Sequence, residues 1–194
     1  MEIRTYIRTL ATERRLAAIH EAGHVVIARS FGMVCQGEIY PTHTSDLARE
    51  RTWTGRIFRQ MSGKRRGRLI VPTKKQLRMI AVAGAIASTY WQNRKIVRRE
   101  PRLDWWDSIW WSEMYKTDWQ LAECPARVRN PDKKLCAAAK EVAALLKPVG
   151  GQLWPSLLLI ARELIEDSRE LPGGDILTLY GTVNVPEPIH VTPN

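Results

Sequence analysis

The segment His20-Glu21-Ala22-Gly23-His24 lies within an apolar run that extends from Leu16 to Ala28. Apolar residues stand on both sides of the five-residue motif, and no proline interrupts the run. This pattern predicts a helix, which we place over about residues 12–31. Positions i and i+4 of an α-helix lie on one face, about 6 Å apart along the axis. His20 and His24 are therefore expected to direct their imidazoles toward the same point.

Two histidines at this spacing, with a glutamate directly after the first, are typical of zinc peptidases. Both imidazoles can bind one ion, while Glu21 lies beside them without binding it. From there the carboxylate of Glu21 can take a proton from a water molecule that zinc activates. The alternative is a pair of surface histidines around a solvated glutamate, but the apolar flanks argue against it. We expect one zinc ion per chain, with His20 and His24 as ligands and Glu21 as the catalytic base.

The surrounding sequence resembles the peptidase domain of the FtsH family, the membrane-anchored ATP-dependent zinc metallopeptidases. Residues 17–26 and 74–87 resemble two helices of that domain, and residues 37–41 and 53–57 resemble its short strands. The resemblance extends over about residues 10–170 and is most specific at the first helix. It implies a zinc-dependent metalloendopeptidase that hydrolyses peptide bonds, present here as a stand-alone domain without the ATPase module or the membrane anchor.

A catalytic zinc needs three protein ligands and an open position for water. In the resembling family the third ligand is an aspartate at the start of a helix, followed by an apolar residue and, four positions on, by alanine. Asp118 fits this pattern, and Thr117 before it is a suitable helix cap. Spacing favours Asp104 as the alternate third ligand, because Asp118 requires an insertion of about fourteen residues, which a surface connection tolerates. Asp107 and Glu113 remain further alternatives.

Five of the eight tryptophans lie between residues 105 and 119. Large flat apolar side chains can wall a substrate cleft and exclude water from a reacting centre. The same residues can also form a packed helix face, because Trp106, Trp110 and Met114 follow a four-residue step. The tryptophans that we consider for a substrate cleft beside the zinc are Trp105, Trp111 and Trp119.

The remaining pattern predicts a mainly α (α+β) fold with a small β-sheet region. We expect short strands up to about residue 57, a basic loop, and helices over about residues 73–94, 133–146 and 153–169. Pro148 separates the last two helices, which we expect to form a C-terminal helical hairpin. We place the peptidase-like domain at residues 1–171. Residues 172–194 are predicted to form an extended or disordered tail, in which residues 176–180 could pair as a strand.

Composition limits the function further. A chain of 194 residues with 44% hydrophobic content can bury one core, so a single domain is the default. No stretch has the length and apolar character of a transmembrane segment, and the first residues lack the apolar block of a signal peptide. The three cysteines are widely spaced and contain no Cys-x-x-Cys pair. We therefore expect a cytoplasmic protein with reduced thiols.

The formal net charge of +10 is concentrated in two runs, residues 63–68 and 94–99. Such runs attract phosphate, anionic lipid or acidic protein segments, and charge alone does not choose among these. No nucleic-acid-binding motif accompanies them, so we do not expect nucleic acid as the partner. The expected partners are a protein or peptide substrate and a separate unfoldase, and an oligomer is left open. The alternative function is a non-catalytic, zinc-stabilised interaction module whose basic surface binds a protein partner or nucleic acid.

Overall fold

The computed structural model describes residues 3–41, 53–60, 64–65, 68–69, 71–95, 111, 113–124, 132–167, 169–170 and 179–185. This part of the chain is mainly helical with small β-sheets, as predicted. The helices are α1 (Ile3–Ser30), α2 (Lys74–Gln92), α5 (Lys116–Leu121), α6 (Lys133–Leu146) and α7 (Trp154–Asp167). The strands are β1 (Val34–Pro41), β2 (Trp53–Gln60), β3 (Lys64–Arg65), β4 (Arg68–Leu69), β5 (Arg169–Glu170) and β6 (Leu179–Val185).

The larger sheet is antiparallel and has the strand order β2-β1-β6-β5. Strands β1 and β2 were both predicted, and their register places Glu38 opposite Arg56. The guanidinium Nε of Arg56 donates a hydrogen bond of 2.9 Å to Oε2 of Glu38. This cross-strand ion pair stabilises the register between β1 and β2. The register in turn fixes where the other residues of β2 lie, including Gly55. A separate two-stranded sheet, β3 with β4, occupies part of the predicted basic loop.

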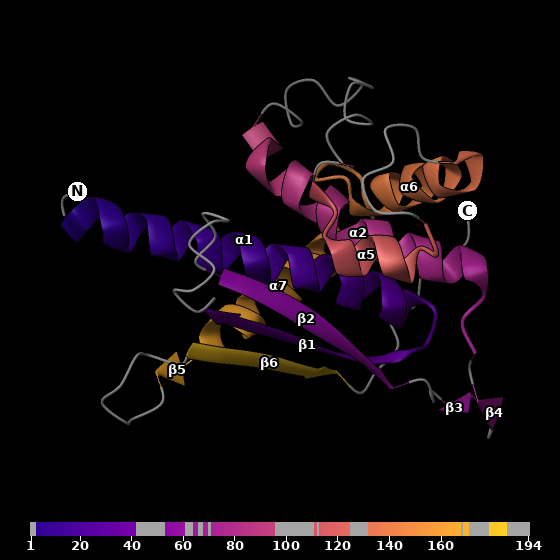
Figure 1. Ribbon diagram of the computed structural model, residues 1–194, viewed down its shortest axis with the longest axis horizontal. Coiled ribbons are helices and arrows are strands. Elements are labelled where there is room, and N and C mark those ends of the chain that lie inside the picture. Colours follow the sequence, from indigo (N-terminus) through magenta and orange to yellow (C-terminus); the bar gives the residue numbers. More distant parts are fainter. Residues whose placement is uncertain are drawn as a thin grey trace.

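Helix α1 is the central element of the described structure (Figure 1). It packs on β1 and β2 on one side and on α2 on the other. Its residues 17–28 are all buried, which explains the apolar run on both sides of the histidine motif. Small residues allow the two helices to approach closely: a Cβ placed on Gly23 would lie 2.6 Å from the carbonyl oxygen of Ala83. The histidine motif is thereby enclosed between the sheet and α2.

Helix α2 begins with a capping box. The hydroxyl of Thr73 accepts a hydrogen bond from the backbone N–H of Gln76, and Oε1 of Gln76 accepts one from the backbone N–H of Thr73. These reciprocal bonds satisfy two N–H groups that a helix end would otherwise leave without partners. Residues 79–90 of α2 are all buried, because α1 covers one side of the helix and α6 another.

Helices α6 and α7 follow each other in the chain, as predicted, but they do not pack on each other as a hairpin would. Helix α6 packs on α2, whereas α7 packs on α1 and β6, and the contact between α6 and α7 is slight. Each helix has an apolar stripe, with Leu135, Val142 and Leu146 buried in α6 and Leu157, Ile160 and Leu164 buried in α7. The two stripes meet different partners, so α6 and α7 support opposite sides of the α1–α2 pair.

Strand β6 lies within residues 172–194, the segment that we predicted to form an extended or disordered tail. It pairs with β1, with Val183 opposite Gly37, and also pairs with β5. The predicted strand at residues 176–180 overlaps the start of β6, which begins at Leu179. Residues 179–185 are therefore extended and belong to the same sheet as β1 and β2.

In the described residues, no helix has both the length and the apolar character required to cross a membrane.

Candidate metal centre

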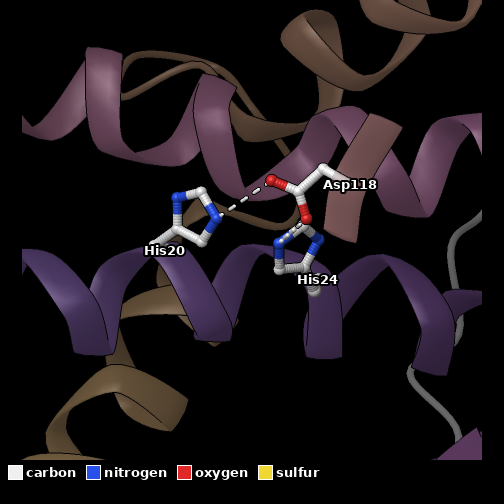
Figure 2. Close-up of side chains that lie close together, drawn as sticks. All are labelled: His20, His24 and Asp118. Carbon is white, nitrogen blue, oxygen red and sulfur yellow. Dashed lines mark ion pairs between the residues drawn. The ribbon is translucent and has the colours of Figure 1, made fainter. Parts of the chain in front are cut away.

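The side chains of His20 and His24 point from α1 toward the carboxylate of Asp118 on α5 (Figure 2). Nε2 of His24 lies 3.3 Å from Oδ1 of Asp118, and Nε2 of His20 lies 3.5 Å from Oδ2. The centroids of the two imidazole rings are 4.9 Å apart. All three side chains are buried. The predicted face of α1 and the preferred third residue therefore meet at one point in the structure.

The opposite nitrogens of the two imidazoles contact α2. Nδ1 of His24 lies 2.7 Å from the backbone carbonyl oxygen of Ile80, and Nδ1 of His20 lies 3.2 Å from the hydroxyl Oγ of Ser88. A carbonyl oxygen only accepts hydrogen bonds, so Nδ1 of His24 carries the proton that it donates. This contact orients His24 and leaves its Nε2 as the nitrogen that is suited to a metal ion.

Asp118 is held by the first turn of the short helix α5. The backbone N–H of Tyr115 donates a hydrogen bond of 2.8 Å to Oδ2 of Asp118. Thr117 was predicted to be the helix cap, but this prediction is wrong: Tyr115 is the N-cap and Thr117 lies inside the helix. The difference arises because the Asp118 carboxylate reaches back to the N-cap backbone. The Tyr115 ring also meets the His20 ring edge-on, with centroids 4.5 Å apart.

The donor group could hold a metal ion. One ligand atom from each of His20, His24 and Asp118 can be chosen so that all three atoms lie within 4.8 Å of one another. Gly84 of α2 faces this group, and a Cβ at that position would lie 2.4 Å from Nε2 of His24 and 2.5 Å from Nε2 of His20. A side chain on residue 84 would occupy the space next to both nitrogens. Two imidazoles and a carboxylate also form a donor set found in catalytic zinc sites.

Glu21 lies beside the donor group, on a different side of α1 from the two histidines. Its side chain is buried, with 3% of the residue surface exposed. Gly55 of β2 lies close to the Glu21 side chain. A Cβ added to Gly55 would lie 2.3 Å from Cγ of Glu21 and 2.7 Å from Oε1 of Glu21. The absence of a side chain at Gly55 therefore leaves room for the Glu21 carboxyl group between α1 and the sheet.

The charges in this buried group influence one another strongly. Burial raises the pKa of Glu21 to about 8; the positive charge of His24 opposes this rise, and the negative charge of Asp118 adds to it. For His24, burial opposes the charged form, but the charge and hydrogen bond of Asp118 outweigh burial and raise the pKa to about 9, with smaller contributions from Glu21 and Ile80. Burial also opposes the charged form of Asp118, yet the two histidines hold its pKa well below the usual value.

The other candidates fall in different places. Asp104 and Asp107 lie outside the described residues, and Glu113 is described but does not belong to the donor group. Trp119, which we considered for the substrate cleft, is only 2% exposed and packs in the hydrophobic core instead. Trp111 is partly buried, with its ring centroid 6.1 Å from that of Trp119. The tryptophans outside the described residues are Trp105, Trp106 and Trp110.

Sequence reasoning did not find the residues of α2 that contact the histidines. Ile80, Gly84 and Ser88 are spaced four residues apart, so they lie along one face of α2, and that face meets the histidine face of α1. A glycine flanked at this spacing by an apolar residue and a serine was a visible signal in the sequence. Its meaning depended on knowing that α2 packs on α1.

Comparison of the sequence with protein-family models and with curated proteins gives no match.

Proposed function

We propose that this protein is a zinc-dependent metalloendopeptidase. The observation that carries the proposal is the position of a buried glutamate, Glu21, next to a group of three metal-binding side chains to which it does not belong. A structural zinc site is usually closed by four protein ligands. A catalytic site has three protein ligands, and a further group nearby accepts and donates protons. The described residues supply three donors, so the arrangement favours the catalytic type.

The choice of zinc follows from the donor types. Imidazole nitrogen suits zinc, copper, nickel and iron, whereas calcium and magnesium prefer sites made of oxygen alone. Two imidazoles and one carboxylate, buried from solvent, match a peptidase zinc site most closely. The resemblance of residues 17–26 to the FtsH peptidase helix agrees with this choice.

In the proposed mechanism, three residues bind the metal ion and Glu21 transfers protons. A zinc ion, when bound, lowers the pKa of water and polarises a carbonyl group. His20, His24 and Asp118 would hold the ion, and Glu21 would accept the proton of the attacking water. Glu21 then gives this proton to the amine that leaves when the peptide bond breaks. The Glu21 carboxyl group is buried beside the donor group, in the space that Gly55 leaves open, and this position suits it to both transfers.

The sheet offers a reason to expect a peptide as the substrate. Strand β2 is at the edge of the larger sheet in the described part of the chain, because it pairs with β1 on one side only. The backbone of such a strand can pair with an extended peptide. Gly55 lies on this strand and touches Glu21, so a peptide added at this edge would run beside the proposed base.

The wider resemblance extends the proposal to substrates and partners. The FtsH family unfolds its substrates with an ATPase module before cleavage. We propose that the present domain acts in the cytoplasm on unfolded segments, on short peptides or on one specific protein, and that a separate unfoldase supplies any folded substrate.

The test compares the zinc-loaded wild type with the Glu21→Gln variant. We expect one zinc ion per chain in both proteins, and cleavage of a chemically unfolded, fluorescently labelled protein by the wild type alone. Equal cleavage by Glu21→Gln would overturn the role of Glu21. A wild type that binds no zinc, even after reconstitution, would overturn the metallopeptidase proposal. A wild type that binds zinc but leaves the unfolded protein intact would favour the non-catalytic interaction module.

A further inference from the structure

Ser88 is a buried polar residue on α2 that the proposed mechanism does not use. It is 2% exposed, and its hydroxyl oxygen lies 3.2 Å from Nδ1 of His20 on α1. Thr89, the next residue, is also buried, but its hydroxyl donates to the carbonyl oxygen of Ala85 within the same helix. Bonding back to the preceding turn is common for hydroxyl side chains in helices. Ser88 instead joins two helices at a candidate metal ligand.

The contact places Ser88 and Ile80 in equivalent positions with respect to the two histidines. Each lies at the Nδ1 side of one imidazole, while the Nε2 side of both rings faces Asp118. A histidine that binds a metal through one nitrogen commonly donates its other N–H to an oxygen atom, which orients the ring and selects the tautomer. Ile80 supplies a carbonyl oxygen to His24, and Ser88 supplies a hydroxyl oxygen to His20.

The two oxygen atoms differ in chemistry. A carbonyl oxygen can only accept, whereas a hydroxyl can accept or donate. His24 therefore has a fixed partner for its Nδ1 proton, while the partner of His20 can serve either tautomer. Without an acceptor at Ser88, the Nδ1 proton of His20 would lose its buried partner at this position, and the tautomer required for metal binding through Nε2 would be disfavoured.

We propose that Ser88 is a positioning residue for the metal site: its hydroxyl oxygen accepts a hydrogen bond from the Nδ1–H group of His20, so that Nε2 faces the metal ion. This inference rests on the proposed metal site. Ser88 acts through His20 and is not itself a ligand. Its chemical role is the same as that of the Ile80 carbonyl, but it is carried by a side chain and can be removed by mutation.

The first measurement is the affinity for zinc alone, determined by competition with a chromophoric chelator. Ser88→Ala is expected to bind zinc about 10- to 100-fold more weakly than the wild type. Thr89→Val is the matched control, because it removes a buried hydroxyl from the adjacent position of the same helix without touching a histidine. We expect the zinc affinity of Thr89→Val to equal that of the wild type.

The second measurement is nuclear magnetic resonance of the imidazole nitrogens in the zinc-loaded proteins. In the wild type, both His20 and His24 should show a proton on Nδ1 that exchanges slowly with water. In Ser88→Ala only the His20 signal should be lost, because the Ile80 carbonyl still holds His24. A purely structural role of Ser88 would lower the thermal stability without affecting one histidine selectively.

The outcomes separate this inference from the proposed function. If the wild type binds zinc and Ser88→Ala binds it equally well, Ser88 is not a positioning residue and the metallopeptidase proposal still stands. If the zinc-loaded wild type has no slowly exchanging proton on Nδ1 of His20, the inference is also overturned, whether or not Ser88→Ala folds. If the wild type binds no zinc, both the proposed function and the inference fail.

Discussion

Gly84 and His24 approach each other so closely that a Cβ on Gly84 would lie 2.4 Å from Nε2 of the histidine. The same Cβ would lie 2.5 Å from Nε2 of His20. The glycine thus keeps open the space beside the two imidazole nitrogens that could bind a metal ion. This relationship crosses the α1–α2 interface, and it allows the proposed metal site to be tested without changing any candidate ligand.

Gly84→Ala should weaken zinc binding by about 10- to 100-fold, because the added methyl group competes with the ion for the space beside both nitrogens. Alanine favours a helix more than glycine does, by about 1 kcal/mol, so helix propensity does not oppose this change in α2. The measurement is zinc affinity by chelator competition, with circular dichroism to verify folding. Wild-type affinity in a folded Gly84→Ala protein would show that α2 can move away and that this space is not essential.

Gly55→Ala places the same methyl group against Glu21 instead of the histidines. The new Cβ would lie 2.3 Å from Cγ of Glu21, so the carboxyl group must shift within a buried position. We expect zinc binding to be unchanged and kcat to fall by about 10- to 100-fold, because a displaced base transfers protons less effectively. Steady-state kinetics on an unfolded substrate would measure this effect. Loss of zinc in Gly55→Ala would contradict the separate roles of Glu21 and the donor group.

Asp118→Asn tests the third ligand with almost no change in shape. The neutral amide cannot replace the carboxylate charge opposite the two histidines, so zinc affinity should fall strongly. Glu113→Gln is a suitable control, because it removes a nearby carboxylate that does not belong to the donor group. Metal content by elemental analysis should be lowered in Asp118→Asn alone. Retention of zinc in Asp118→Asn, with loss in Asp104→Asn, would assign the ligand to Asp104.

Protein stripped of metal by a chelator should lose stability as the pH rises from about 5 to about 9. Glu21, with its pKa raised from 4.5 to about 8, and His24, raised from 6.5 to about 9, both hold protons more tightly in the folded protein than in the unfolded chain. The folded state then binds more protons in this range, so the free energy of unfolding falls as the pH rises. Asp118 acts in the opposite direction, and its contribution is lost only in acid.

Glu21→Gln should reduce this pH dependence, because the variant no longer has to bury a carboxylate above neutral pH. The urea midpoint of the metal-stripped wild type should fall between about pH 6 and about pH 9, and that of Glu21→Gln should fall less. The variant should also be the more stable of the two at the higher pH. Identical pH profiles for the two proteins would show that Glu21 does not titrate in this range.

A large part of the fold could be predicted because its signals are local. Helix α6 has the bounds that were expected, and the predicted bounds of α2 and α7 differ from the observed ones by no more than two residues. Helix α1 begins earlier than predicted, at Ile3, because the prediction followed the apolar run, which starts only at Leu16. Periodicity and capping residues determine where a helix forms, and both are properties of neighbouring residues.

The sequence by itself determined that His20 and His24 share one face of a helix and that Glu21 lies beside them, because helix geometry fixes neighbours at i+1 and i+4. Only the tertiary structure decided which partners these residues meet. The packing of α2 on α1 brings Ser88, Ile80 and Gly84 to the imidazoles, and the sheet brings Gly55 to Glu21. Such contacts join residues far apart in the chain, and their distances depend on how whole elements pack, which no local pattern specifies.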